Sequence, residues 1–528
     1  MSYSTPPTFN LWSEPWIAVE QPSGDIHTVS IAEILTNAHN IRAIYDPSPL
    51  VVVGIHRLLV AILQTIYSPQ NPRHLVEIWR DKKFIPEKVN DFGTEYADRF
   101  DLFAEDVPFY QTSDISLEPT KENKAKSVGY LFQEQPAGTA VTHYNHSYDA
   151  NLTLCSHCAV KGLLIMPAFA SSGGAGIKPS INGVPPIYVL PGGEHLFHSL
   201  VASLATPAFQ PGANSDGGAW WQRPSPIIVE KSREVRRVNY LHSLTFPARR
   251  IRLHPTPLYE PCSRCGQKTK WGVQTMVYQM GESRSKTAKW WQDPFAAYQV
   301  PKKEDVNPLP VRPVAGRALW REFRSLFLPH EENDKGLKAL RPSIISQIEE
   351  VWRADRTILP YSNIPLRVIG LRTDMKAKIF EWEEAGYQIP PSLLNDLKVA
   401  NDIQESIAFA VTTDNITKKS FHKYFGGGGK TGRYATLKKQ MSQHYWQLLG
   451  AKFQSQLLSY TPNADLKKLF HDWLDITIYE ALTSFEETVN MLPNDGVTLL
   501  KRQEAINDCR KNVFGYRKKN FPRPEEVI

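Results

Sequence analysis

Residues 154–183 read LCSHCAVKGLLIMPAFASSGGAGIKPSING. This stretch begins with a cysteine pair, Cys155 and Cys158, crosses an apolar run and ends in a glycine-rich segment. A second pair, Cys262 and Cys265, lies far downstream within PCSRCG. Two C-x-x-C pairs supply the four thiolates of a tetrahedral structural Zn²⁺, and four thiolates leave no open position for catalysis. We therefore predict that zinc joins the two segments and makes the glycine-rich segment rigid.

The glycine-rich segment, residues 171–178, reads SSGGAGIK. Glycine has no Cβ, so the backbone of such a segment can come close to a partner molecule and can adopt positive φ. The segment is therefore a candidate recognition loop, and we call residues 171–178 the Gly-rich loop.

Composition and charge are typical of a globular protein that is not strongly basic overall. The chain has 528 residues, of which 41% are hydrophobic and 22% charged, and its formal net charge is +7. Basic residues are concentrated in residues 231–252 and from residue 501 onward. Such clusters suit a polyanionic partner, although a solvated helix face would give the same pattern.

The cysteine count and the hydropathy pattern point to the cytoplasm. Four of the five cysteines form C-x-x-C pairs, which fits thiolates bound to metal in a reducing compartment better than disulfides. The N-terminal residues lack the basic and apolar regions of a signal peptide. The longest apolar run, residues 50–66, contains His56 and Arg57, which favours a buried helix over a membrane span.

The distribution of secondary-structure signals predicts an α+β fold with a helical C-terminal part. Ser30 and Glu33 have the spacing of a capping box for a short helix. Short β-type runs between residues 184 and 330 predict a mixed α/β region. Residues 392–412, 437–459, 466–489 and 498–513 have apolar residues at helical spacing, which predicts a four-helix bundle. We expect a mixed domain over 1–365, a linker over 366–390 and the bundle over 391–528.

Motifs for catalysis are weak in this sequence. Residues 426–432, GGGGKTG, resemble a phosphate-binding P-loop, but Tyr424 stands where that motif requires glycine, so we predict a basic loop between two bundle helices. Aromatic and basic side chains within residues 144–148 and 283–291 could stack on nucleic acid or could belong to ordinary loops and a hairpin tip. The sequence therefore favours recognition over catalysis, and we expect no enzyme.

Several motifs together resemble the CasA family, the large subunit of the type I-E CRISPR surveillance complex Cascade. The resemblance covers essentially the whole chain, and its specific motifs include both cysteine pairs and the Gly-rich loop. The further matching segments are FNLWSEPWIAV at 9–19, RFDLF at 99–103, PFYQ at 108–111, IGLRTD at 369–374 and HYW at 444–446.

This resemblance implies a protein that recognises the PAM, the short DNA motif beside the target, and starts duplex unwinding for R-loop formation. The implied minor-groove contacts come from the Gly-rich loop and a basic hairpin: Ser172, Gly173, Gly174, Ala175, Gly176, Lys178, Arg284, Lys286 and Lys289. Met375 and Lys376 stand where the family carries a wedge, often a glutamine, beneath the PAM. Tyr144 and His146 match a loop that docks on the guide RNA and neighbouring subunits.

The implied partners are PAM-containing double-stranded DNA, guide RNA, the backbone, guide-end-capping and small subunits of Cascade, and a recruited helicase-nuclease, with no membrane. Two other readings stay open from the residues alone. One is a zinc-containing nuclease or other nucleic-acid enzyme, and the other is a protein-only scaffold whose zinc is structural.

Overall fold

The structure is a computed structural model that divides into two compact units. Unit 1 contains Met1–Pro313, His330–Pro360 and Pro365–Gly386, and unit 2 contains Val314–Pro329, Tyr361–Ile364 and Tyr387–Ile528. The residues described are 7–118, 124–132, 152–171, 176–210, 217–285, 292–301, 307–314, 319–328, 338–358, 363–373, 379–394, 396–426, 434–461 and 463–523.

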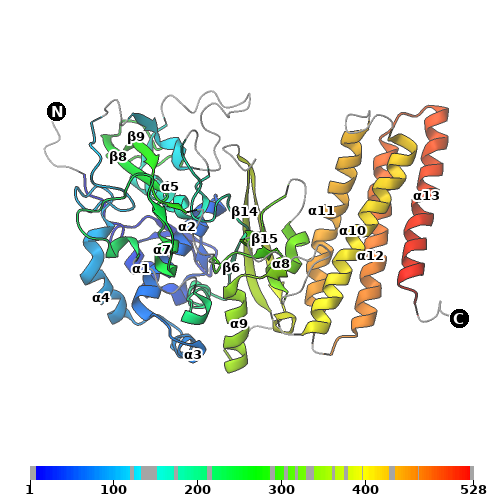
Figure 1. Ribbon diagram of the computed structural model, residues 1–528, viewed down its shortest axis with the longest axis horizontal. Coiled ribbons are helices and arrows are strands. Elements are labelled where there is room, and N and C mark those ends of the chain that lie inside the picture. Colours follow the sequence, from blue (N-terminus) through cyan, green and yellow to red (C-terminus); the bar gives the residue numbers. More distant parts are fainter. Residues whose placement is uncertain are drawn as a thin grey trace. The chain divides into compact units, whose positions relative to one another are not determined.

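Short helices surround a central apolar helix, α2, in unit 1 (Figure 1). These helices are α1 (Ile31–Thr36), α2 (Pro49–Tyr67), α3 (Pro72–Arg80), α4 (Pro86–Tyr96), α5 (Ser156–Phe169), α6 (Leu196–Ala202), α7 (Tyr240–Leu244) and α9 (Ser343–Ala354). Ser30 and Glu33 form the predicted capping box of α1. Helix α2 is long and apolar enough to cross a membrane, but 89% of its most apolar window is buried, and Arg57 in it pairs with buried Asp293 at 3.0 Å. It is therefore a core helix, as its two polar residues predicted.

The strands of unit 1 are short and form several small sheets. They are β1 (Ile17–Glu20), β2 (Ile26–Val29), β3 (Ala43–Ile44), β4 (Ala125–Ser127), β5 (Leu154–Cys155), β6 (Tyr188–Pro191), β7 (Glu234–Val235), β8 (Arg249–Pro257), β9 (Trp271–Met280), β10 (Ser283–Arg284), β11 (Tyr298–Val300), β12 (Leu309–Pro310), β13 (Lys338–Leu340), β14 (Ile364–Thr373) and β15 (Ile379–Ile389). The sheet orders are β2-β1-β3, β12-β11-β13 and β15-β14-β6, with β10 parallel to β7.

The sheet that positions the candidate site is built on β9. Strand β8 pairs with β9 along its whole length, from Arg249 opposite Met280 to Pro257 opposite Trp271. Strands β4 and β5 both pair with β9 as well, and Cys155 lies opposite Gly272. The chain thus brings the first cysteine pair beside the turn that joins β8 to β9, which carries the second pair.

Unit 2 contains the predicted four-helix bundle. Its helices are α8 (Phe323–Phe327), α10 (Leu397–Phe425), α11 (Ala435–Leu458), α12 (Leu466–Asn490) and α13 (Gly496–Asn520), and the last four form the bundle (Figure 1). Helix α10 continues to Phe425, well beyond the predicted end at 412, because its apolar face continues through Phe421 and Phe425 into the bundle core. A helix, and no strand, therefore precedes the segment that resembled a P-loop.

The unit boundaries differ from the predicted domain division at several places, including residues 314–329 and 366–390. Residues 314–329 belong to unit 2, because the Trp320 ring stacks on Phe453 with centroids 4.7 Å apart and its Nε1 donates to the Trp446 carbonyl at 3.3 Å. Most of residues 366–390 lies in β14 and β15, where we expected a linker. The pairing of β14 with β6, distant in sequence, supports this strand and could not be read from local composition.

Candidate metal centre and nucleic-acid interface

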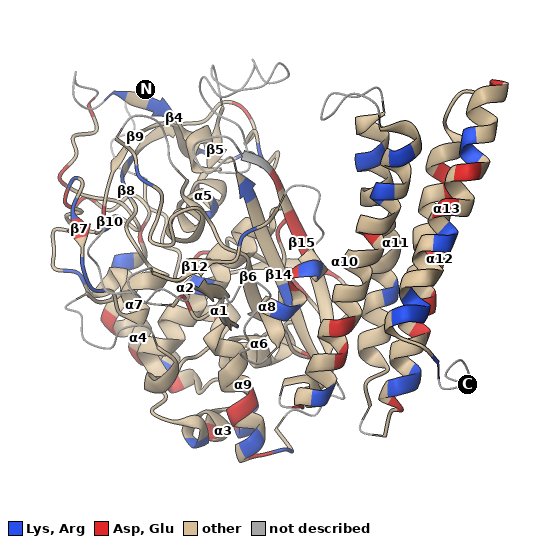
Figure 2. Cartoon of the chain, turned by 45° about the vertical axis from the view of Figure 1, so that its right-hand side comes forward, with Lys and Arg blue, Asp and Glu red and all other residues tan. Residues whose placement is uncertain are grey.

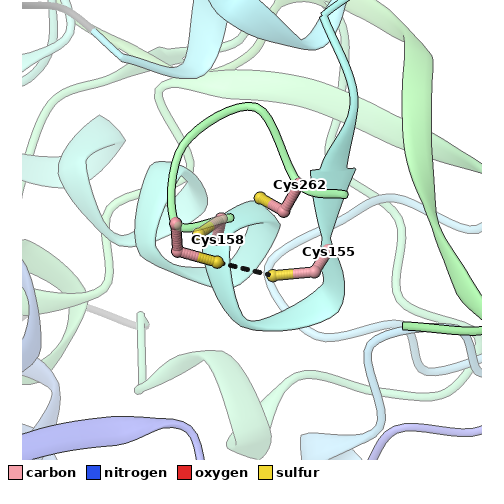
Figure 3. A group of neighbouring side chains, drawn as sticks. Cys155, Cys158 and Cys262 are labelled. Atoms are coloured by element: carbon pink, nitrogen blue, oxygen red, sulfur yellow. Dashed lines mark hydrogen bonds between the residues drawn. The ribbon is translucent and has the colours of Figure 1, made fainter. Parts of the chain in front are cut away.

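The four paired cysteines converge on one point of unit 1, as predicted. The sulfur atoms of Cys155, Cys158, Cys262 and Cys265 all lie within 4.8 Å of one another. The Cys155 and Cys265 Sγ atoms are 3.7 Å apart. Figure 3 shows Cys155 and Cys158 at the start of α5, with Cys262 reaching them from the β8–β9 turn. A tetrahedral zinc with bonds of about 2.3 Å places its sulfurs about 3.8 Å apart, so the four side chains fit this ion.

Backbone hydrogen bonds fix the second pair in a tight turn. The Cys262 amide donates to the Gln267 carbonyl at 2.9 Å, and the Gly266 amide donates to the Cys262 carbonyl at 2.8 Å. Gly266 has a φ of +72°, a conformation that a residue with a Cβ adopts only at a cost. The Ser263 amide donates to the Thr153 carbonyl at 2.8 Å, which ties this turn to the chain just before β5.

The protonation pattern of three of these thiols, Cys155, Cys158 and Cys262, also fits a cation-binding cluster. Hydrogen bonds with Cys155 and Cys158 lower the pKa of Cys262 far below its usual range. A hydrogen bond to Cys158 lowers the pKa of Cys155, but its interaction with Cys262 and its burial outweigh this and raise it to about 12. The pKa of Cys158 is raised by its hydrogen bonds with both neighbours. Without a metal ion, the cluster therefore stabilises one thiolate, that of Cys262, through hydrogen bonds from protonated neighbouring thiols. A bound Zn²⁺ would replace the protons of those thiols.

A buried ion-pair network links the β8–β9 turn to α5. Arg264, between the two downstream cysteines, donates to Asp46 at 2.5 Å, and Lys161 on α5 lies 3.0 Å from the other oxygen of that carboxylate. Burial raises the pKa of Asp46, but the hydrogen bond from Arg264 and the charge of Lys161 lower it below its usual value. The network therefore fixes α5 and the β8–β9 turn against each other.

The ends of the Gly-rich loop are held by one buried arginine. Arg249, the first residue of β8, is 3% exposed, and its guanidinium donates to the Lys178 carbonyl at 2.9 Å and to the Ser171 carbonyl. It also donates to the Tyr278 hydroxyl at 2.8 Å. The Ser180 amide donates to the Ala170 carbonyl at 2.7 Å, which closes the base of the loop. Residues 172–175, including the candidates Ser172, Gly173, Gly174 and Ala175, lie outside the described residues.

The predicted connection between zinc and the rigidity of the Gly-rich loop stays a prediction, because residues 172–175 lie outside the described residues. The cysteines lie at the start of α5 and the Gly-rich loop follows its end, so the 14 residues of the helix separate the two by about 21 Å. Arg249, which sequence analysis assigned to a basic cluster, is the residue that holds the loop. Strand β8 reads RRIRLHPTP, with three arginines among its nine residues, so the local sequence does not distinguish Arg249 from its neighbours.

Two described residues of the loop face solvent. Gly176 has a φ of +80° and has no atom within 4 Å of the place a Cβ would take. The Lys178 side chain is 52% exposed and its Nζ lies 2.8 Å from Glu234 on β7. The Lys178 side chain is therefore accessible at the surface, where it forms an ion pair with the Glu234 carboxylate.

Only the first part of the predicted basic hairpin lies within the described residues. Residues Tyr278–Met280 end β9, and Arg284 lies in the short strand β10, which pairs with β7 and not across a hairpin. Arg284 is partly buried, and this burial lowers the pKa of its guanidinium below the ordinary value. Lys286 and Lys289 lie outside the described residues, as do the wedge candidates Met375 and Lys376 and the docking candidates Tyr144 and His146.

Much of the predicted basic surface is internal. Arg250 and Arg252 on β8 are 9% and 7% exposed, and Arg250 pairs with Asp114 at 2.8 Å. In the bundle, Arg502 and Arg517 are buried as well. Figure 2 shows basic and acidic positions interspersed along α12 and α13. Lys231, Arg233, Arg236 and Arg237 of the first cluster are exposed, whereas acidic residues interrupt the second cluster.

Comparison with known proteins agrees with the fold. The family described as CRISPR-associated protein Cse1 matches residues 10–483. CRISPR-associated protein CasA/Cse1 of Thermus thermophilus is 28% identical over 424 residues, which are 76% of this chain and 75% of the relative. The crystal structure of Cse1 from Acidimicrobium ferrooxidans covers 98% of this chain and 100% of its own, with a TM-score of 0.78 and 18% identity. A chain from a CRISPR RNA-guided surveillance complex covers 96% of this chain and 99% of its own length, with a TM-score of 0.72 and 19% identity. This chain belongs to the Cse1 family of CRISPR-associated proteins.

Proposed function

We propose that this chain is the large subunit of a type I-E CRISPR surveillance complex and that it recognises the PAM in double-stranded DNA. The observation that carries the proposal is the Gly-rich loop, whose two ends are joined to one buried guanidinium while Gly176 and Lys178 face solvent. Because minor-groove edges differ little between base pairs, a reader there depends on close backbone approach. A loop with fixed ends and no side chains over 173–174 suits that task.

In this proposal the chain carries out recognition and no catalysis. The four cysteines hold a structural Zn²⁺ that joins the β8–β9 turn to α5, and their full set of thiolates leaves no position for a reactive water. The protein works in the cytoplasm with guide RNA, the other Cascade subunits and a helicase-nuclease that it recruits. After PAM contact, Met375 or Lys376 separates the first base pair, at a cost of a few kcal/mol per unstacked step.

The test of PAM recognition uses the assembled complex and a duplex with or without a PAM. Gly174→Asp adds a bulky anion where backbone must approach phosphate-rich DNA, so PAM-dependent binding should be lost while the complex still assembles. Gly496→Asp is the matched control, because it adds the same charge at a glycine that has open space around it in the bundle. Unchanged PAM-dependent binding by Gly174→Asp, or failure of its complex to assemble, would contradict a reading role.

The wedge requires a separate kinetic measurement. Met375→Ala and Lys376→Ala should slow strand opening, followed with a fluorescent base beside the PAM, more than they slow initial duplex binding. Equal slowing of the two steps would place the wedge elsewhere in the chain.

A further inference from the structure

A second group of metal-ligating side chains lies in unit 1, in the turn that joins β6 to α6. Residues 194–198 read EHLFH. One ligand atom each from Glu194, His195 and His198 lies within 4.8 Å of the others, the same limit that the four cysteines meet. The helix α6 begins one residue after His195, so the turn brings all three side chains together. Figure 2 shows β6 and α6 as neighbouring elements.

The two imidazoles are held side by side by their surroundings. The rings of His195 and His198 stack with centroids 3.9 Å apart and an interplanar angle of 25°. His198 is 7% exposed and also stacks on Trp79 of α3, with centroids 5.6 Å apart. The Leu196 amide donates to the Ile41 carbonyl at 2.7 Å, which fixes the start of α6 against the segment after α1. The ligand atoms are therefore brought together before any ion binds.

Two ring nitrogens at this place, one on His195 and one on the neighbouring His39, lack ordinary partners among the described residues. The Nδ1 atoms of His195 and of His39, which lies on the segment that meets α6, are buried and have no hydrogen-bond partner among the described residues. A buried nitrogen without a partner costs free energy, and a metal ion is a common partner of a neutral imidazole. The exposed carboxylate of Glu194 provides an oxygen ligand and leaves the group accessible to ions from solvent.

We propose that Glu194, His195 and His198 bind a divalent transition-metal ion, of which Zn²⁺ is the representative, at a site separate from the four cysteines. Two imidazoles and one carboxylate form a nitrogen and oxygen donor set that suits Zn²⁺ and other first-row divalent ions. Binding at about 2.0–2.2 Å requires the side chains to close around the ion from their present spacing. The ion would join the β6–α6 turn into one rigid unit and would leave a coordination position open.

The test counts metal ions on the full-length chain after metal removal with a chelator. With Co²⁺ as the probe, the chain should bind two ions, and only the one at the cysteines should produce a thiolate-to-metal charge-transfer band. Glu194→Gln and His195→Ala should each weaken the second ion by more than about 100-fold, because each removes a direct ligand and not only a supporting residue. The charge-transfer band should stay unchanged in both variants, which shows that they are folded.

His27→Ala is the matched control, since His27 is an exposed histidine on β2 outside this group. It should leave both ions bound. Binding of a single ion by the unaltered chain would overturn the proposal, and so would a second ion whose affinity does not change in Glu194→Gln and His195→Ala. Equal weakening in His27→Ala would likewise assign the second ion to general surface histidines and reject the site.

Discussion

Replacement of Arg249 by lysine should release the Gly-rich loop without removing a positive charge. Two hydrogen bonds of the guanidinium go to the carbonyls of Ser171 and Lys178, on opposite sides of the loop. A lysine ammonium has no planar fork and cannot reach both carbonyls together with Tyr278. At about 1.5 kcal/mol for each charge-assisted bond, the loss destabilises the closed loop by about 3 kcal/mol, which raises its opening constant about 100-fold.

Hydrogen–deuterium exchange measured by mass spectrometry follows this opening directly. The informative peptide contains Ser180, whose amide donates to the Ala170 carbonyl at the base of the loop. Arg250→Lys is the matched control, because Arg250 is the next residue of β8, is also buried, and pairs with Asp114 and the Val229 carbonyl away from the loop. Exchange at Ser180 should rise about 100-fold in Arg249→Lys and much less in Arg250→Lys.

Equal exchange in the two variants would show that loss of either guanidinium loosens the whole sheet and that Arg249 has no special role at the loop. Unchanged exchange in Arg249→Lys would refute the reasoning outright. In that case the bond between Ser180 and Ala170 would be sufficient to close the loop.

Three further results are expected. Cys262→Ser should lose the zinc bound by the purified chain and lower its melting temperature, whereas Cys509→Ser, a buried bundle cysteine outside the cluster, should keep the metal, as measured by elemental mass spectrometry. Glu234→Gln should leave the melting temperature nearly unchanged, because an exposed pair contributes about 0–1 kcal/mol, yet it frees Lys178 and should tighten PAM-duplex binding of the assembled complex a few-fold. Burial raises the pKa of Asp402 from 3.8 to about 6, so the folded bundle keeps a proton that the unfolded chain releases, and stability falls as the pH rises between those values. Asp402→Asn should therefore raise the melting temperature at pH 7 and remove this pH dependence, and an unchanged profile would contradict it.

Local patterns in the sequence predicted the features that depend on short-range geometry. The capping box at Ser30 needs only residues within one helical turn, and it is present. The two C-x-x-C pairs were sufficient to predict a four-sulfur cluster, because this spacing lets the two thiols of each pair bind the same ion. The four bundle helices followed from apolar periodicity, although the end of α10 did not, since tertiary packing continues it beyond the predicted boundary.

The features that sequence analysis missed depend on contacts between distant segments. Arg249 bonds to carbonyls 78 and 71 positions earlier in the chain, and main-chain acceptors carry no signal in side-chain identity. Arg250 and Arg252 read as surface charge, yet the sheet buries them with Asp114 and other partners. The parallel pairing of Arg284 in β10 with Val235 in β7 also joins segments that are distant in sequence, so no local pattern indicated it.

The separation of the cysteine cluster from the Gly-rich loop by helix α5 has a practical consequence for protein engineering. Segments of altered length or composition could be exchanged between Ser171 and Lys178 while the four-cysteine cluster at the far end of the helix stays unchanged. Under the proposed function, a library of such replacements would change which duplexes the protein accepts while each variant keeps the same folded support.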